Sequence, residues 1–276
     1  MRKSYLFFAS LFLIFFAGAC TAEQTPVSLP PTPEVLHPEF ILSQKDWVSI
    51  LESLPMEIRG LIHENPTQFL EDYKKLFNSS KDSMILVDKK NFLSAEYKPN
   101  DLVSLNEYPI LVSRKDLYLR ETIMGQVLAL NKAARDKGLT LLFSSSYRSY
   151  QYQKGLFDRY VAQDGLEEAQ RYSARPGTSQ HQLGTAIDFG SITEAFAKTP
   201  EGKWLKENAG RFGFSLSYPQ DYEEVTGYMW EPWHYRYIGV EACQIQQRWF
   251  GNVQQYLLEF HKKWGDFLKE RWNTPT

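Results

Sequence analysis

Two short segments of the chain combine histidine with carboxylate residues in a pattern suited to a metal ion. The first places Asp188 seven residues after His181, and the second places His234 three residues after Glu231. Two imidazoles and one carboxylate can hold zinc in a tetrahedron while a fourth position stays open for water, as in catalytic zinc sites. We therefore predict one zinc ion per chain, bound by His181, Asp188 and His234, with Glu231 as the general base.

A third segment supplies a cation that could meet an anionic substrate. Arg148 stands between Tyr147 and Ser149, and its planar guanidinium can pair with a carboxylate through two parallel hydrogen bonds. Each candidate has a plainer interpretation when taken alone. His181 could be a structural loop histidine, Glu231 an ordinary strand-end carboxylate, and Arg148 half of a surface salt bridge. Their occurrence together favours the metal site.

Strands must hold the predicted ligands. Residues 185–189 predict a strand in which Asp188 shares one face with Ala186, because side chains alternate along a strand. Gly184 allows a turn before this strand, so His181 can approach Asp188.

The second histidine falls in a final strand predicted over 228–238. Residues three apart on a regular strand point to opposite faces, which would separate Glu231 from His234. Pro232 cannot donate a ladder hydrogen bond and therefore indicates an edge or a bulge. A local kink there can turn both side chains inward.

The remaining sequence predicts helices around a small set of strands. Helices are expected over 44–54, from 55 onward, and over 67–77, 116–137, 150–163, 199–210 and 256–272. Further strands are expected over 84–87 and 139–144, with a loop over 96–105. Strand and helix do not alternate regularly. The pattern favours an α+β fold, in which a small antiparallel sheet holds the zinc site and is flanked by helices, with helical N- and C-terminal extensions.

The N-terminus has the features of an export signal that ends at a lipidated cysteine. Two basic residues precede an apolar run that is too short to span a membrane. Small residues then lead to Cys20, as in a bacterial lipobox. We expect a signal peptide over 1–19, a lipid on Cys20 and a Pro-rich spacer over 20–38. Ordinary cleavage near Ala19, leaving a free cysteine, is the alternative.

Charge and cysteine content limit the partners. The chain has 31 Lys and Arg against 33 Asp and Glu, a net charge of −2, and removal of the signal leaves 29 against 33, or −4. Nucleic-acid-binding proteins usually carry a basic footprint, so no nucleic acid is expected. A lipid on Cys20 would leave Cys243 without an intramolecular partner, so we expect no disulfide.

The motifs resemble those of the VanY-type D-alanyl-D-alanine carboxypeptidases, zinc peptidoglycan peptidases of the LAS superfamily. The matching elements, in the family's order, are S-S-Y-R-S at 145–149, S-x-H-x-x-G-x-A-x-D at 179–188 and E-P-W-H-Y at 231–235. The resemblance spans roughly 84–239. It implies that Arg148 polarises the scissile carbonyl or anchors a carboxylate. It also implies that Gln153 and Ser179 contact the terminal carboxylate of the peptide.

The resemblance and the end segments together define the expected organisation. A helical N-terminal extension would cover 39–80, the zinc carboxypeptidase domain 81–240, and a C-terminal helical extension 241–276. The implied activity is removal of the terminal D-alanine from peptidoglycan stem peptides, by zinc-bound water that Glu231 activates. The implied location is the bacterial cell envelope, where the exported protein would be anchored to the membrane through the lipid on Cys20.

Two alternatives stay open. The same fold and metal chemistry would serve an L,D-carboxypeptidase or a peptidoglycan endopeptidase, because the motifs do not specify the stereochemistry of the residue before the cut. A non-catalytic cell-wall-binding lipoprotein could also keep the fold as a scaffold. An intact set of ligands, base and arginine favours an enzyme.

Overall fold

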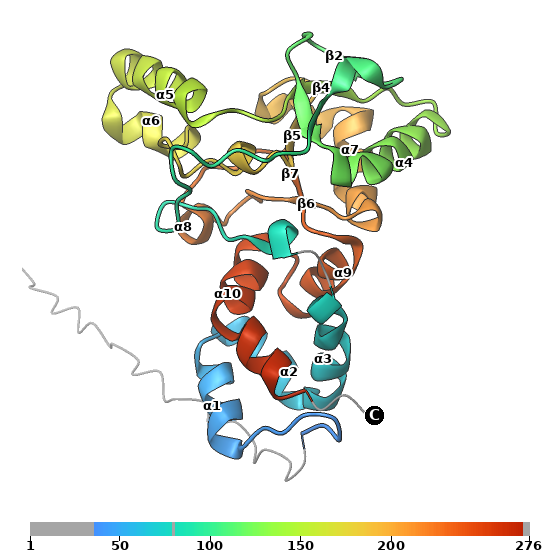
Figure 1. Cartoon of the computed structure of the whole chain (residues 1–276), viewed down its shortest axis with the longest axis vertical. Coiled ribbons are helices and arrows are strands. Elements are labelled where there is room, and N and C mark those ends of the chain that lie inside the picture. Colours follow the sequence, from blue (N-terminus) through green and yellow to red (C-terminus); the bar gives the residue numbers. More distant parts are fainter. Residues whose placement is uncertain (1–35, 79–80, 273–276) are drawn as a thin grey trace, which may run out of the picture. The chain divides into compact units, whose positions relative to one another are not determined.

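The computed structural model describes residues 36–78 and 81–272, and a five-stranded sheet lies at the centre of the region that carries the motifs (Figure 1). The strands, in their order across the sheet, are β2 (Leu111–Val112), β4 (Leu142–Ser145), β5 (Ala186–Phe189), β7 (His234–Tyr237) and β6 (Phe214–Leu216). The pairs from β4 to β6 are antiparallel, and β2 joins β4 in parallel. The predicted α+β class is confirmed.

One face of this sheet builds a hydrophobic core. Ile187 and Phe189 of β5 point into this core, as the alternation predicts, and Tyr235 of β7 joins them. Phe189 packs edge-on against Phe143 of β4, with ring centroids 5.0 Å apart. The helix α4 (Met124–Arg135) covers this core with residues that include Val127. The opposite face of β5 is left to carry Asp188.

The helices have the following bounds in the described part of the chain. They are α1 (Gln44–Glu52), α2 (Met56–Glu64), α3 (Pro66–Tyr73), α4 (Met124–Arg135), α5 (Tyr150–Asp164), α6 (Leu166–Tyr172), α7 (Pro200–Asn208), α8 (Glu223–Thr226), α9 (Val240–Trp249) and α10 (Gln254–Glu270). Side chains cap the first turns of α1 and α7. Ser43 forms a capping box at α1, and the side chain of Thr199 accepts a hydrogen bond at the start of α7.

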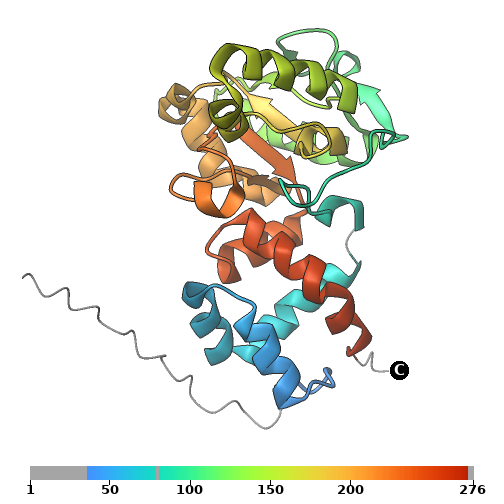
Figure 2. The same ribbon diagram turned by 90° about the vertical axis from the view of Figure 1, so that its left-hand side faces the viewer.

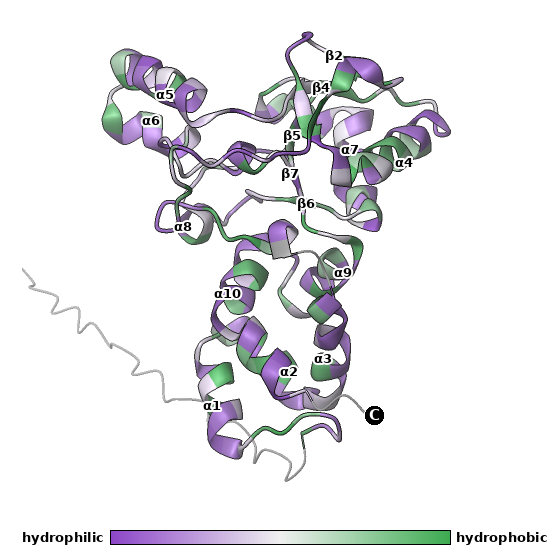
Figure 3. Cartoon of the chain, in the orientation of Figure 1, coloured by the Kyte–Doolittle hydropathy of each residue, from purple (hydrophilic) through white to green (hydrophobic). Residues whose placement is uncertain are grey.

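The N-terminal and C-terminal helices share a second hydrophobic core (Figures 1 and 2). Phe69 of α3 packs edge-on against Trp249 of α9 and Phe260 of α10, at 5.6 Å between ring centroids in both cases. Hydrophobic and hydrophilic stretches alternate along α2 and α10, as expected of helices that bury one face (Figure 3). The domain boundaries at 80/81 and 240/241 stay predictions.

Several local expectations were wrong. The segment 84–87 forms no strand; Met84 ends a short 3₁₀-helix, and the carbonyl of Ile85 accepts a hydrogen bond from the Arg236 side chain at 2.6 Å. The Arg236 side chain therefore occupies the Ile85 carbonyl, which would have accepted a backbone hydrogen bond from a neighbouring strand.

The segment before α4 was also misassigned. Tyr118–Arg120 forms β3, which pairs antiparallel with β1 (Leu102–Ser104), so the helix begins at Met124 and not at 116. Leu119 fitted the helical spacing, but Leu117 and Leu119 are both buried and alternate as in a strand. The predicted loop over 96–105 accordingly contains β1.

The predicted signal peptide, Cys20 and most of the spacer lie outside the described residues. Over 36–78 and 81–272, no helix is both long enough and apolar enough to cross a membrane.

Candidate metal centre

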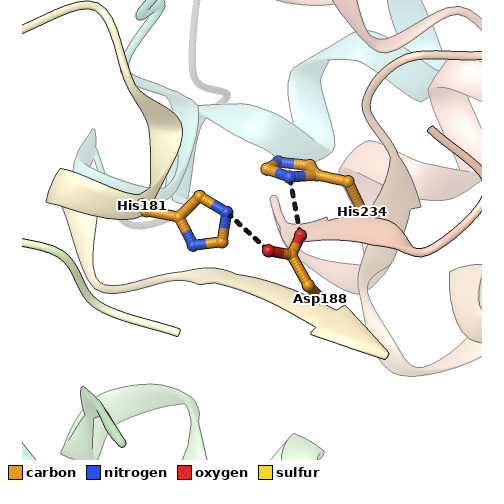
Figure 4. A group of neighbouring side chains, drawn as sticks. All are labelled: His181, Asp188 and His234. Atoms are coloured by element: carbon orange, nitrogen blue, oxygen red, sulfur yellow. Dashed lines mark ion pairs between the residues drawn. The ribbon is translucent and has the colours of Figure 1, made fainter. Parts of the chain in front are cut away.

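Asp188 and His234 are brought together by strand register. They are directly paired residues on the neighbouring antiparallel strands β5 and β7, and paired side chains share one face of a sheet. His234 Nδ1 lies 3.0 Å from Asp188 Oδ1 (Figure 4). Both residues are almost completely buried.

His181 reaches the same carboxylate from a short 3₁₀-helix, Gln180–Leu183. Ser179 caps this helix, and Gly184 ends it in the left-handed region with φ 72°, where a side chain would be strained. His181 Nε2 then lies 3.3 Å from Asp188 Oδ2. Donor atoms of His181, Asp188 and His234 all lie within 4.8 Å of one another, so the structure brings the three predicted ligands together.

The outward ring nitrogens of both histidines are held by acceptors. His181 Nδ1 lies 2.7 Å from the carbonyl oxygen of Ser146, and His234 Nε2 lies 3.2 Å from Gln180 Oε1. A carbonyl or amide oxygen can only accept, so the ring proton sits on these nitrogens. The inward nitrogens, His181 Nε2 and His234 Nδ1, therefore present lone pairs toward Asp188, which is the tautomer that a metal ligand needs.

This donor set fits a zinc ion. His181 Nε2 and Asp188 Oδ1 are buried and have no hydrogen-bond partner, although each lies close to another acceptor. The lone pairs of the two rings face the carboxylate oxygens of Asp188, and a cation between them would relieve the repulsion. Burial, reinforced by Arg148, lowers the pKa of His181 to about 4, so a proton is not retained there near neutral pH. Two imidazoles and a carboxylate match the preferred ligands of zinc.

The carboxylate of Asp188 is held in its ionised form. Burial alone would raise its pKa, but the imidazoles of His181 and His234 lower it well below the usual value. An ionised carboxylate is the form that binds a metal ion.

Glu231 lies beside the triad in a turn before β7. Its carbonyl oxygen accepts a hydrogen bond from the His234 N–H at 3.1 Å, which closes a turn through Pro232 and Trp233. Glu231 Oε2 lies 3.5 Å from His234 Nδ1. The strand is thus shorter than predicted, and the kink that Pro232 indicated brings Glu231 and His234 to the same side.

The environment of Glu231 favours its protonated form. Burial raises the pKa of Glu231 well above its usual value, the charge of Asp188 raises it further, and Arg148 opposes both. A carboxylate with a raised pKa accepts a proton more readily and can later return it, as a general base and acid must.

Arg148 is fixed above Asp188 by three side chains. It donates to Ser145 Oγ at 3.2 Å, Gln153 Oε1 at 3.1 Å and Asp188 Oδ2 at 3.0 Å. Ser145 is the last residue of β4 and is paired with Asp188, so the strand end delivers the arginine as predicted. Arg148, Asp188 and Glu231 all line a cleft of about 390 Å³.

Aromatic side chains form much of the remaining wall of this cleft. They are Tyr152, Tyr160, Tyr172 and Trp233. The first three come from the helix pair α5 and α6. The cleft thus combines charged groups with aromatic rings, as is typical of a ligand-binding site.

The chain has sequence relatives of known family. A family model described as VanY, D-alanyl-D-alanine carboxypeptidase, matches residues 116–240. The chain is 35% identical over 193 residues to YodJ of Bacillus subtilis, covering 66% of this chain and 71% of YodJ. It is 35% identical over 192 residues to a D-alanyl-D-alanine carboxypeptidase of Enterococcus faecalis, covering 66% of this chain and 68% of that protein. The chain belongs to the VanY carboxypeptidase family.

Solved structures agree with the family assignment. The structure of the LD-carboxypeptidase LdcB superposes with a TM-score of 0.58 and 34% identity, covering 64% of this chain and 85% of that one. A mutant of the vancomycin resistance D,D-pentapeptidase VanY in complex with Zn(II) superposes with a TM-score of 0.53 and 33% identity. The match covers 65% of this chain and 99% of that one. This VanY-family protein is therefore an enzyme of a zinc metallopeptidase family.

Two predicted substrate contacts of this VanY-family enzyme are engaged within the protein. Gln153 accepts from Arg148 and donates to the carbonyl of Ala174 at 2.7 Å. Ser179 Oγ accepts from the N–H of His181 at 3.3 Å. In this structure Gln153 holds the arginine and Ser179 holds the first histidine, and their contact with substrate stays a prediction.

Sequence reasoning missed the buried polar residues around His234. Gln180 contacts His234 Nε2, and the ring of Tyr218 lies 4.8 Å from the His234 ring between centroids. Arg236 is fully buried, two residues after His234 on the same strand. Gln180 occupies an unspecified position inside the first motif, and Tyr218 lies in no motif, so only tertiary structure could find them.

Proposed function

We propose that this protein is a zinc-dependent D,D-carboxypeptidase that removes the terminal D-alanine from peptidoglycan stem peptides. The observation that carries the proposal is the buried set of His181, Asp188 and His234, with Glu231 and Arg148 beside it in one cleft. Membership of the VanY family supports the reaction class. A scaffold protein would have no need to keep Glu231 buried next to a metal site.

His181 through Nε2, Asp188 through its carboxylate and His234 through Nδ1 would hold one zinc ion per chain. When bound, zinc supplies Lewis-acid chemistry that makes water acidic enough to lose a proton near neutral pH. The side chain of Asp188 is kept anionic and the two rings are kept in the ligating tautomer by the contacts described above. The protein thus prepares the site before metal arrives.

Glu231 would take the proton from the attacking water and later deliver it to the leaving amine of D-alanine. Its raised pKa suits both steps, because the carboxylate must hold the proton between them. Its distance of 3.5 Å from His234 Nδ1 places it beside the metal-binding atoms without making it a required ligand.

Arg148 would bind the substrate at the base of the cleft. Its guanidinium is oriented by Ser145, Gln153 and Asp188, so little side-chain entropy remains to be lost when a peptide binds. We assign it to the scissile carbonyl or to the terminal carboxylate. Gln153 and Ser179 would support the terminal carboxylate, directly or through Arg148 and His181.

An L,D-carboxypeptidase is the second candidate. The LD-carboxypeptidase LdcB superposes with a TM-score of 0.58. The two activities differ in the residue before the cut, which has the D configuration in one case and the L configuration in the other, and the same metal chemistry serves both. A peptidoglycan endopeptidase would use the same site on a longer peptide.

The cellular setting follows from the substrate. Stem peptides lie outside the cytoplasmic membrane, and the family relationship supports an envelope or extracellular location. We propose in addition that Cys20 carries a lipid, which would anchor the exported enzyme to the membrane through the spacer ending at 38. No nucleic acid partner is proposed.

The test is digestion of defined peptides by the full-length protein, followed by mass spectrometry. A pentapeptide ending in D-Ala-D-Ala should lose one D-alanine, a chelator should stop the reaction, and added zinc should restore it. Cleavage of a tetrapeptide in place of the pentapeptide would instead establish the L,D activity. Absence of cleavage by the zinc-loaded protein on either peptide and on cross-linked muropeptides would refute the enzymatic proposal.

A further inference from the structure

A buried hydrogen-bond chain connects the metal-ligating His234 to the C-terminal helix. His234 Nε2 lies 3.2 Å from Gln180 Oε1, and Gln180 Nε2 donates to Gln254 Oε1 at 3.2 Å. Gln254 is the first residue of α10 and lies outside residues 116–240 that match the family model. Both glutamines are buried, with 3% and 1% of their surfaces exposed.

The direction of these hydrogen bonds is set at Gln254. Gln254 Nε2 faces the backbone carbonyl of Ser215 at 3.4 Å. That carbonyl can only accept, so Gln254 must present its amide nitrogen there and its oxygen to Gln180. Gln180 must then present its own nitrogen to Gln254 and its oxygen to His234. Each amide thereby fixes the orientation of the next.

Ser217 reinforces the same polarity. Its hydroxyl donates to Gln180 Oε1 at 2.7 Å and lies 3.4 Å from Gln254 Oε1. Gln180 Oε1 therefore has two donors, the hydroxyl of Ser217 and the ring N–H of His234. A flipped Gln180 amide would place its NH₂ group against the ring N–H of His234, and two buried donors that face each other are costly.

We propose that Gln254 is a positioning residue, which acts through Gln180 to keep His234 in the tautomer that carries its proton on Nε2 and offers Nδ1 to a metal ion. The C-terminal helix would thus complete the metal centre. The inference rests on the proposed zinc site only for the effect on metal binding, since the tautomer belongs to the metal-free protein as well.

Loss of the Gln254 acceptor has a defined consequence. Gln180 Nε2 would be buried without a partner, so its amide could turn and offer a donor to His234 Nε2. The ring proton would then move to Nδ1, which faces Asp188 Oδ1 at 3.0 Å. A hydrogen bond from Nδ1 to Asp188 would occupy both atoms and compete with the metal ion.

The experiment compares two neighbouring glutamines of α10 in the full-length protein. Gln254→Met removes the acceptor at nearly constant size. Gln255→Met is the matched control, because Gln255 is also buried but donates to Asp88 at 2.8 Å and Glu259 at 2.8 Å, away from the site. The zinc dissociation constant is measured by competition with a chromophoric chelator. The His234 tautomer is measured from side-chain ¹⁵N shifts of the metal-free protein.

Gln254→Met should weaken zinc binding by roughly 10- to 100-fold, the usual effect of losing a partner behind a metal ligand. It should also give a His234 signal with the proton on Nδ1. Gln255→Met should keep the wild-type zinc affinity and the Nε2–H tautomer of His234, even if its melting temperature falls by as much as that of Gln254→Met. Unchanged affinity and tautomer in Gln254→Met, or an equal loss in Gln255→Met, would overturn the inference.

A milder variant tests the role of these hydrogen bonds if Gln254→Met does not fold. Ser217→Ala deletes one oxygen and one donor to Gln180 Oε1, and should weaken zinc binding by roughly 2- to 10-fold; wild-type affinity would count against the inference. Failure of the wild-type protein to bind zinc would refute the proposed function. The tautomers of the metal-free wild type and variants would still decide the role of Gln254.

Discussion

Asp188 and His234 are paired across two antiparallel strands, and His234 Nδ1 lies 3.0 Å from Asp188 Oδ1. The sheet register therefore sets the spacing of two of the three proposed zinc ligands. A slip of one residue would turn one of these side chains to the opposite face. The core residues Ile187, Phe189 and Tyr235 on that face oppose such a slip, so the packing that stabilises the sheet also maintains the candidate metal centre.

Asp188→Asn should abolish stoichiometric zinc binding. The amide keeps the size of the side chain but removes the negative charge that a carboxylate ligand brings to a metal ion. Metal analysis of the dialysed protein should give less than about a tenth of the wild-type zinc. Asp158→Asn is the control, since Asp158 is exposed and paired with Lys154, and it should keep full zinc. Wild-type zinc content in Asp188→Asn would show that the metal lies elsewhere.

Arg148→Lys should lower kcat/KM by roughly 10- to 100-fold, because an ammonium cannot reproduce a planar guanidinium that contacts Ser145, Gln153 and Asp188 at once. Steady-state kinetics on a pentapeptide measures the effect. The exposed Arg135 provides the comparison, and Arg135→Lys should be neutral. Equal kinetics for the two variants would remove Arg148 from substrate binding.

The grouping of His181, Asp188 and His234 could be predicted from sequence because most of it is local. His181 and Asp188 lie within eight consecutive residues around a glycine turn, and the alternation of the strand placed Asp188 away from the core. Glu231 required the kink at Pro232, which the sequence indicated without showing that Glu231 precedes the strand altogether. Motif spacing thus predicted which residues lie close together, whereas the geometry of the turn at Pro232 had to come from the structure.

The environment of His234 could not be predicted, since it depends on contacts between distant segments. Gln180 and Gln254 are 74 residues apart and meet only in the folded chain. The missed strand β3 has a different cause. Leu119 satisfied helical and strand periodicity equally, and pairing with Val103 of β1 decided between them. Tertiary pairing overrides local propensity in such short segments.

Cys243 should be unreactive in the native protein. It is buried in the helical core, and burial raises the pKa of its thiol, which suppresses the reactive thiolate. In a Cys20→Ser background, a thiol reagent at pH 8 should detect no thiol before unfolding and one thiol after it. A Cys243→Ser, Cys20→Ser protein should give none in either state. Rapid labelling of the native protein would mean that the core around α9 opens readily.

Cys20 should carry a lipid in the bacterial cell. Radiolabelled palmitate should be incorporated into the wild-type protein and not into Cys20→Ser, and only the wild type should fractionate with membranes. Equal labelling of both proteins would point to a different anchor. Absence of label from both would favour ordinary signal cleavage and a freely secreted enzyme.

Glu231→Gln tests the central claim most directly, because glutamine keeps the size of the side chain but cannot accept a proton. Zinc content and peptide affinity should stay near wild type, since Glu231 is neither a proposed ligand nor a substrate-binding residue. Turnover of a D-Ala-D-Ala pentapeptide should fall by at least about 10²- to 10⁴-fold, the usual contribution of general base catalysis. Near-normal turnover would remove Glu231 from the mechanism, and loss of zinc would make it a ligand; either result would contradict the account.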